Sequence, residues 1–362
     1  MSVATARSEA RADDAAESPA LVVEGLTTSI RIERHWFDAV RDVSFDVHRR
    51  ETLALVGESG CGKSLTALSV MGLLPAGVGR VTRGRIVVDG VEMTGASDAQ
   101  VQAMRGDRIG MVFQEPMTSL NPVLPVGFQI AESLVEHRGM GNREARLRAL
   151  ELMELVRIPA AAERLDAYPH QFSGGMRQRV MIAIALACGP TLLFADEPTT
   201  ALDVTVQAQI LDLLNEQRKD RNMSLILVTH DLGVVAGHTD EICVMYGGQL
   251  VERAPTKVLF ANMKMPYTEA LMQSIPKIED ASHSRLLAIG GRPPDLVNPP
   301  QGCRFAPRCM YARDKCREEM PPLIETEVAG HFYRCWYPVG SPEYHESRAR
   351  LNEIPVTVGE AS

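Results

Sequence analysis

Short apolar runs alternate with amphipathic stretches from Leu21 to about Asn262, a pattern typical of an α/β domain with a largely parallel sheet. Four of these runs have the length of a strand and are largely apolar, as expected for strands that are covered on both faces. They are Thr52–Val56, Ile109–Phe113, Leu192–Ala195 and Leu225–Val228. Polar or glycine residues follow each run, and ligands bind at the carboxyl ends of strands in such sheets. The pattern therefore predicts one site at the four strand ends.

Two other regions have different patterns. At about 115–172 the pattern is that of helices, and Arg143–Arg157 is rich in strong helix formers, which predicts a helical subdomain. The segment Pro255–Pro342 contains 12 of the 22 prolines. This composition predicts a linker at Pro276–Pro300, followed by a small segment that contains cysteines.

Length and composition limit the class of protein. The 362 residues include 45% apolar and 23% charged residues, so the chain can form a sizeable core and is not disordered throughout. The longest apolar run, Val180–Cys188, is far shorter than the ~20 residues of a membrane-spanning helix. The net charge of −8 argues weakly against a nucleic-acid-binding protein.

The first twenty residues mix acidic residues with alanine and contain no apolar segment of a secretory signal, so we expect a disordered leader at 1–20. Without a signal, the seven cysteines are expected in a reducing cytosol, either free or bound to metal. We expect a main domain at 21–265, an extension at 266–340 and a tail at 341–362.

A phosphate-binding loop follows the first of the four runs. The sequence fits G-x-x-x-x-G-K-[ST], with an apolar strand before it and a run compatible with a helix after it. The loop consists of Gly57, Glu58, Ser59, Gly60, Cys61, Gly62, Lys63 and Ser64. Its glycines let backbone N–H groups face phosphate oxygens at a helix N-terminus. We expect Lys63 to contact the β- and γ-phosphates of a nucleotide and the Ser64 hydroxyl to bind Mg²⁺.

Two acidic residues end the third run. Asp196 occupies the position where an NTPase makes a second contact to Mg²⁺ through water. Glu197, one residue further on, is suited to polarise the attacking water. Considered without the phosphate loop, the same pair is equally consistent with a solvated turn.

The segment Phe172–Arg179 resembles the signature, usually L-S-G-G-Q, of the nucleotide-binding subunits of ATP-binding cassette (ABC) transporters. Its signature residues are Ser173, Gly174, Gly175 and Met176. Physically it is a second phosphate site without a lysine, in which Ser173 caps a helix N-terminus. An ordinary Ser-capped helix is the alternative for these residues alone.

The resemblance implies that this segment completes the ATP site of a partner subunit, so that hydrolysis requires a dimer with two nucleotides between its subunits. By the same resemblance, Gln114 contacts Mg²⁺ and senses the membrane subunit, and Ala201–Asp203 contacts the partner. His230 matches the switch histidine that binds the γ-phosphate and the attacking water. A lone histidine is more often structural. The aromatic residue that stacks on adenine is either Trp36 or Phe37, and the spacing does not decide between them.

Met176 differs from the usual signature and resembles the D-type ATPase subunit of peptide importers, as do the residues at 175–183 and 196–205. This implies an ATPase that powers a bacterial importer for oligopeptides, dipeptides or a related small solute. The implied partners are two integral-membrane permeases, a second and different ATPase subunit and, indirectly, an extracytoplasmic solute-binding protein, with no nucleic acid. The implied location is peripheral, at the cytoplasmic face of the inner membrane.

Four cysteines lie close together in the sequence near the C-terminus. Cys303, Cys309, Cys316 and Cys335 have a spacing that differs from zinc ribbons and from the common bacterial [4Fe–4S] pattern, so a metal site and unrelated cysteines are both open. The extension of peptide-importer ATPases resembles this segment, and the resemblance implies a [4Fe–4S] cluster. Arg304 and Arg308 would then offset part of its negative charge.

The residues of the site together with the resemblance imply ATP and Mg²⁺ as ligands and Lys63, Glu197 and His230 as catalytic residues. A different class of function is a non-transport ABC ATPase that acts on DNA or the ribosome. Such proteins carry long coiled-coil insertions or two cassettes, and this chain has neither. A third is a metal-dependent regulatory or redox protein whose cassette only senses nucleotide, and the presence of both Glu197 and His230 argues against it.

Overall fold

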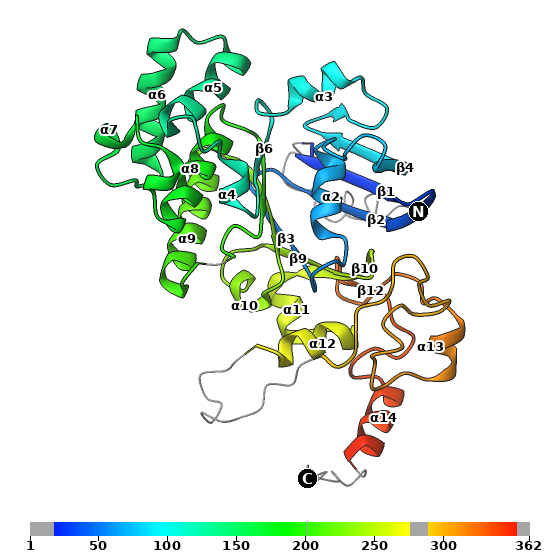
Figure 1. Ribbon diagram of the computed structural model, residues 1–362. Coiled ribbons are helices and arrows are strands. Elements are labelled where there is room, and N and C mark those ends of the chain that lie inside the picture. Colours follow the sequence, from blue (N-terminus) through cyan, green and yellow to red (C-terminus); the bar gives the residue numbers. More distant parts are fainter. Residues whose placement is uncertain (1–17, 201, 276–288, 353–362) are drawn as a thin grey trace, which may run out of the picture.

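The computed structural model of the chain describes residues 18–200, 202–275 and 289–352. Most of the predicted leader, Ala201, the first half of the predicted linker and the end of the predicted tail lie outside the described residues. Figure 1 shows a central sheet with a group of helices on one side and a small C-terminal part on the other.

The central sheet has eight strands in the order β11-β12-β10-β9-β3-β8-β7-β6. The strands β9, β3, β8, β7 and β6 pair in parallel, and β10, β12 and β11 continue the sheet antiparallel. Their bounds are β3 Thr52–Val56, β6 Ile109–Val112, β7 Leu192–Asp196, β8 Ser224–Thr229, β9 Glu241–Tyr246, β10 Gln249–Pro255, β11 Ile324–Glu325 and β12 Phe332–Tyr333. The four apolar runs in the sequence form β3, β6, β7 and β8, and their side chains are buried because helices and the second sheet cover both faces.

A second, antiparallel sheet has the order β2-β1-β4-β5. It consists of β1 Leu21–Ile32, β2 His35–Val47, β4 Gly79–Val88 and β5 Val91–Glu92. The first helix after the phosphate loop, α2 Lys63–Val70, packs between this sheet and β7. Leu21, Phe45, Leu55 and Val70 belong to the buried cluster that joins the two sheets. The short helix α3 Asp98–Met104 follows, with Ser97 as its N-cap.

The region at 115–172 contains helices, as the sequence pattern indicates. They are α4 Pro116–Ser119, α5 Val126–Arg138, α6 Asn142–Leu155 and α7 Ala161–Arg164, followed by a 3₁₀ turn at Pro169–Gln171. The helix α8 Gly174–Leu186 contacts α4, α5 and α6 and also β6, so it connects this helical group to the central sheet. In Figure 1 these helices form the green group that projects to one side.

The remaining helices are α9 Val204–Asp220, α10 Leu232–Val235, α11 Thr256–Asn262, α12 Pro266–Gln273, α13 Asp314–Glu318 and α14 Pro342–Asn352. We call residues 289–341 the C-terminal module. The module joins the sheet through β12, which pairs with β10, and through His331, whose Nε2 lies 2.9 Å from the buried Glu252 carboxylate. A buried cluster next to it pairs Arg253 with Asp46 at 2.7 Å and with Glu241 at 3.0 Å.

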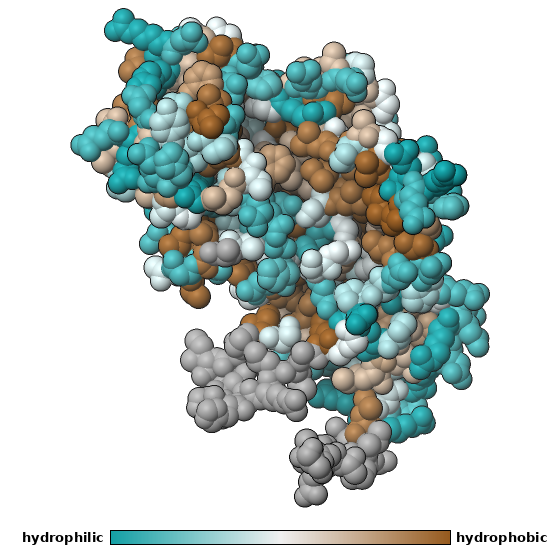
Figure 2. Space-filling view, viewed as in Figure 1, coloured by the Kyte–Doolittle hydropathy of each residue, from teal (hydrophilic) through white to brown (hydrophobic). Residues whose placement is uncertain are grey.

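None of the helices in the described ranges has both the length and the apolar character to span a membrane. In the view of Figure 2, mostly hydrophilic side chains cover the C-terminal module around α13, and hydrophobic side chains gather around α2 and the four-stranded sheet.

Candidate nucleotide-binding site

The carboxyl ends of three parallel strands meet at one edge of the central sheet. Val56, which precedes the phosphate loop, pairs with Thr229 of β8, and Asp196 of β7 pairs with Val228. Because these pairs are in register, the phosphate loop, the acidic residues and His230 leave the sheet side by side. Parallel pairing therefore brings together residues that lie far apart in the sequence, as the strand pattern predicts.

Glycine is required at two positions of the phosphate loop. Gly62 is the N-cap of α2 with φ of 104°, in the left-handed region that residues with a Cβ disfavour. A Cβ on Gly57 would lie 2.3 Å from the carbonyl oxygen of Met245 on β9. The loop can therefore follow this path only without side chains at these positions.

Lys63 is 4% exposed, and its ammonium group makes hydrogen bonds within the loop. Its Nζ donates to the carbonyl oxygens of Gly57 at 2.7 Å and of Glu58 at 3.1 Å. A buried ammonium group at a helix N-terminus favours binding of an anion. The amine is thus close to the loop that is expected to surround the phosphates.

The first two predicted Mg²⁺ contacts lie next to each other. The Ser64 hydroxyl donates to Oδ1 of Asp196 at 3.1 Å. Burial raises the pKa of the Asp196 carboxyl, and the hydrogen bond from Ser64 opposes this only in part. Hydroxyl and carboxylate oxygens are the ligands that Mg²⁺ prefers, so this pair fits the ion. The third predicted contact, Gln114, instead donates through Nε2 to Glu197 at 3.1 Å.

The Glu197 carboxylate has three polar neighbours. Oε2 accepts from Gln114 and from the Thr200 hydroxyl at 2.9 Å, and Oε1 lies 3.4 Å from Nδ1 of His230. The Glu197 side chain is 13% exposed, whereas that of His230 is 59% exposed. Glu197 also has φ of 45°, a conformation that is uncommon for residues other than glycine and that often occurs at functional sites.

Thr200 is a site residue that the sequence analysis did not single out. Its N–H donates to the carbonyl oxygen of Glu197 at 3.1 Å, which closes a turn and places the hydroxyl on the carboxylate of the same residue. A threonine three residues after a candidate base, in a segment without strand or helix pattern, is the signal that could have identified it.

The signature segment begins α8 as predicted, with the Ser173 hydroxyl accepting from the Met176 N–H at 3.4 Å. Ser173 and Gly174 are exposed, and Gly175 lies against α9, where a Cβ would be 2.9 Å from Val206 Cγ1. The start of α9 is capped by Asp203, whose carboxylate accepts from the Val206 N–H at 3.0 Å. The signature therefore lies against the start of α9, which directly follows the predicted partner-contacting loop.

The two candidate adenine-stacking residues lie on β2 and are both partly exposed. The Arg80 guanidinium lies over the Trp36 ring, 4.1 Å from its centroid, whereas the Phe37 ring is 6.3 Å from that of His35. One face of the Trp36 ring is thus covered by the Arg80 guanidinium. No cation lies over the Phe37 ring among the residues that the structure describes.

The four predicted cysteine ligands lie near one another, because burial together with the charges of Cys303, Cys309 and Cys316 raises the pKa of Cys335. Among the described residues, no three or more His, Cys, Asp or Glu side chains are arranged to hold a metal ion, so the ligand set that the resemblance implies for a [4Fe–4S] cluster has no support in the structure. Its four cysteines, Cys303, Cys309, Cys316 and Cys335, carry free thiols. Burial raises the pKa of Cys309 to about 12, and the charges of Cys303 and Cys316 add to this. The thiols thus lie near enough to influence one another's pKa. Metal ligation requires the deprotonated thiolate form of each cysteine.

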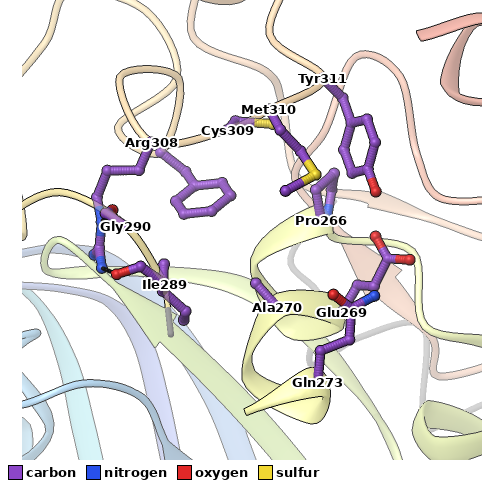
Figure 3. Close-up of a pocket in the computed structure, with 11 residues that line it drawn as sticks. Pro266, Glu269, Ala270, Gln273, Ile289, Gly290, Arg308, Cys309, Met310 and Tyr311 are labelled. Carbon is purple, nitrogen blue, oxygen red and sulfur yellow. Dashed lines mark hydrogen bonds between the residues drawn. The ribbon is translucent and has the colours of Figure 1, made fainter. Parts of the chain in front are cut away.

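Arg304 and Arg308 were predicted to offset the charge of a cluster, and the structure shows other partners for both side chains. Arg304 donates to the Gly247 carbonyl, and burial lowers the pKa of its guanidinium to about 10. Arg308 forms an ion pair with Glu58 in the phosphate loop. A pocket lies beside Arg308, between α12 and the C-terminal module, with Arg308 and Ile289 on one side of it and Met310 and Glu269 on the other (Figure 3).

Two protein families match this chain. Residues 40–200 match the family described as ABC transporter, and residues 251–316 match the oligopeptide/dipeptide transporter C-terminal region. The dipeptide transport ATP-binding protein DppD of Bacillus subtilis is 48% identical over 87% of this chain and 94% of its own length. The oligopeptide transport ATP-binding protein AppD of the same organism is 49% identical over 88% of this chain and 97% of its own length.

Solved structures show the same fold. The ATP-binding cassette MJ0796, in a dimeric post-hydrolysis state bound to ADP and Pi, aligns with a TM-score of 0.59 and 28% identity, over 65% of this chain and 98% of its own. The cassette cbiO1 of Clostridium perfringens, part of an ABC transporter complex, has the same TM-score and identity over 68% of this chain and 92% of its own.

Proposed function

The chain belongs to the family of ATP-binding subunits of oligopeptide and dipeptide ABC transporters, and from this premise we propose that it hydrolyses ATP to power a bacterial importer of peptides or a related small solute. The observation that supports ATP hydrolysis most directly is the meeting of a buried lysine, a Ser64–Asp196 pair and the Glu197 carboxylate at one edge of the sheet. The match over 251–316 supports the transported class, because it covers a region outside the cassette.

The phosphate-binding roles follow from the chain's own donors. Lys63 moves from the carbonyls of Gly57 and Glu58 to the β- and γ-phosphates, an exchange of one set of oxygen acceptors for a more strongly charged one. Ser64 and Asp196 would hold Mg²⁺, which would offset phosphate charge. Gln114 would add its amide oxygen to this set while its Nε2 donates to Glu197, so its amide would link the Mg²⁺ site to the catalytic carboxylate.

Glu197 acts as the general base that orients and polarises the attacking water. Thr200 and Gln114 fix the direction of its carboxylate by donating to Oε2. His230 is exposed beside it and is free to contact the γ-phosphate. Water activation and phosphate sensing thus come from the ends of two neighbouring strands, β7 and β8.

The signature residues of α8 serve the ATP site of a second subunit. Ser173 and Gly174 are exposed in this chain, and the N–H groups at the start of α8 provide a site for an anion. A solved relative is itself described as dimeric with ADP and Pi bound. We infer that ATP binding closes such a dimer and that hydrolysis reopens it, which drives the membrane subunits.

The partners follow from this role. We propose two permeases, a second ATPase of a different sequence and, indirectly, an extracytoplasmic solute-binding protein, with the chain peripheral at the cytoplasmic face of the inner membrane. Met176 in place of the usual glutamine supports a pair of unlike ATPases. Selectivity for the solute then lies in the membrane and solute-binding subunits.

The test is affinity purification of the Glu197→Gln chain with ATP and Mg²⁺ from solubilised native membranes. We expect two multispanning permeases and a second cassette ATPase to copurify in stable amounts. Glu216→Gln, an exposed α9 residue paired with Arg157, is the matched control and should retain less of the complex because it still hydrolyses ATP. Recovery of ribosomal or DNA-bound proteins in place of permeases would overturn the proposal.

A further inference from the structure

The C-terminal module forms an ion pair with Glu58 of the phosphate loop. The Arg308 guanidinium forms a bidentate pair with the Glu58 carboxylate, at 2.5 Å from Nη1 to Oε2 and 2.8 Å from Nη2 to Oε1. The Arg308 side chain is 4% exposed and that of Glu58 is 26% exposed. The hydrogen bond with Glu58 raises the pKa of Arg308, so its guanidinium keeps its charge. Bidentate pairs shielded from water are stronger than exposed ones and fix geometry.

The backbone of Glu58 is fixed by the neighbouring helix α12. Its N–H donates to the Tyr267 hydroxyl at 2.9 Å, and Tyr267 is fully buried on α12. The Tyr267 ring packs against Tyr246 at the end of β9, with centroids 4.5 Å apart, and against Phe305 of the module at 5.3 Å. Main chain and side chain of Glu58 are thus both attached to elements outside the cassette loop.

Arg308 is itself held in place by other groups. Its Nε donates to the Gly290 carbonyl at 2.8 Å, and Nη2 donates to the Ile289 carbonyl at 3.1 Å. Figure 3 shows the side chain extended along this backbone at one side of the pocket. Since the guanidinium is oriented by two carbonyls, it presents a fixed pair of donors to Glu58 rather than following the loop.

Glu58 also contacts Lys63 directly, because the Lys63 Nζ donates to the Glu58 carbonyl oxygen at 3.1 Å. Glu58 and Lys63 carry the charged side chains of the loop Gly57–Ser64. A carboxylate without a partner beside a triphosphate site would repel the nucleotide. The loop also contains three glycines, so its order depends on contacts from outside it.

We propose that Arg308 is a positioning residue for ATP binding, which acts through Glu58 by neutralising its carboxylate and fixing the phosphate loop. This rests on the proposed ATP site. The C-terminal module thereby influences the affinity of the cassette for nucleotide through the Arg308–Glu58 ion pair. Tyr267 supports the same loop by accepting the hydrogen bond from the Glu58 N–H.

The test is a double-mutant cycle on the full chain, with the dissociation constant of ATP and the kcat and KM of the assembled transporter as readouts. Arg308→Gln should weaken ATP binding and raise KM by about tenfold, the equivalent of losing one charged hydrogen-bonded pair, with kcat within about twofold of the parent. In the Glu58→Gln background the same substitution should change affinity by less than about twofold, because the carboxylate that it neutralises is gone.

Arg313→Gln is the matched control, since Arg313 pairs with Glu346 at the surface of the same module and should bind ATP like the parent. Unchanged affinity in Arg308→Gln would overturn the proposal, and so would an equal loss in both backgrounds, because the effect would then be one of folding. If Arg308→Gln does not fold, Arg308→Lys keeps the charge without the bidentate geometry and should give an intermediate loss. A comparison of ATP binding by the parent chain and by Lys63→Ala tests the proposed ATP site separately. A failure of the ATP site is therefore distinguishable from a failure of the role proposed for Arg308.

Discussion

The helices α2 and α8 begin with glycine-rich segments that resemble each other locally and differ in their surroundings. The start of α2 follows a buried strand, contains the 4% exposed Lys63 and is attached to the C-terminal module through Glu58. The start of α8 has a serine cap and exposed residues, with no basic side chain in its first turn apart from Arg177. One is a nearly complete phosphate site, and the other is half of one.

This difference teaches how the work is divided between two chains. A helix N-terminus attracts an anion in both cases. At α2 the ammonium group, the loop N–H groups and the Mg²⁺ ligands all come from one chain. At α8 the helix N-terminus is exposed and Gly175 rests against Val206 of α9, and under the proposed function its anion comes with a second subunit.

The largest expected effect separates catalysis from binding at the α2 site. Glu197→Gln should lower ATP turnover by about 10²–10⁴-fold, because a general base is lost, while ATP binding stays within about twofold. The measurement is phosphate release by the assembled complex together with a nucleotide titration. Glu216→Gln is the control on α9. Normal turnover in Glu197→Gln would contradict the assigned role.

The next largest effect is expected from the loss of Lys63, which has no counterpart at the start of α8. Lys63→Ala should weaken ATP binding by about 100-fold, since two charge-assisted contacts to phosphate are lost. The affinity is measured on the full chain by equilibrium titration, with the exposed Lys219→Ala as the control for loss of one positive charge. Tight binding by Lys63→Ala would show that α2 binds phosphate no better than a plain helix N-terminus such as α8.

A smaller effect is expected at the start of α8. Ser173→Ala should lower turnover of the assembled complex by about tenfold and leave the affinity of the separate chain for ATP unchanged, because this residue serves the partner's site. Ser97→Ala removes a comparable N-cap from α3, so it controls for the loss of helix stability. A loss of ATP affinity in the separate Ser173→Ala chain would mean that α8 contributes to its own site.

The smallest effect concerns pH. Burial raises the pKa of Asp196, so the folded chain binds this proton more tightly than the unfolded chain does. Stability therefore falls as pH rises from the ordinary aspartate pKa through the raised one. Above that range Asp196→Asn should raise Tm by roughly 1–3 °C, a difference that disappears in acid. Thermal unfolding across pH measures this, with the exposed Asp212→Asn as control. Mg²⁺ affinity of the parent should fall as pH drops through the same range, and a constant affinity would exclude Asp196 as ligand.

Much of the site could be read from the sequence because its parts are local. The spacing of Gly57, Lys63 and Ser64 fixes a strand, a loop and a helix in one stretch of chain, and apolar runs identify the neighbouring strands. Parallel pairing then brings Asp196 and His230 to the same edge. The expected Mg²⁺ pair and the helix cap at Ser173 follow from the same local rules.

The sequence could not reveal contacts made across long separations. The spacing of Cys303, Cys309, Cys316 and Cys335 left a metal site and unrelated cysteines open, because the positions of the four thiols depend on how the module folds around them. The resemblance assigned Gln114 to Mg²⁺, and only the structure shows that its amide Nε2 donates to Glu197. A side chain's partner is decided by packing, which periodicity and spacing do not encode.

The amino-acid sequence by itself determined four strands of the central sheet, the helical region at 115–172, the phosphate loop and the acidic pair, because each depends on residues that lie close together in the chain. Only the tertiary structure decided that Thr200 and Gln114 orient Glu197, and that Arg308 pairs with Glu58 although the two are 250 residues apart. The physical reason is that a charged pair forms wherever folding brings its partners together and excludes water, and this depends on the whole fold rather than on either local segment.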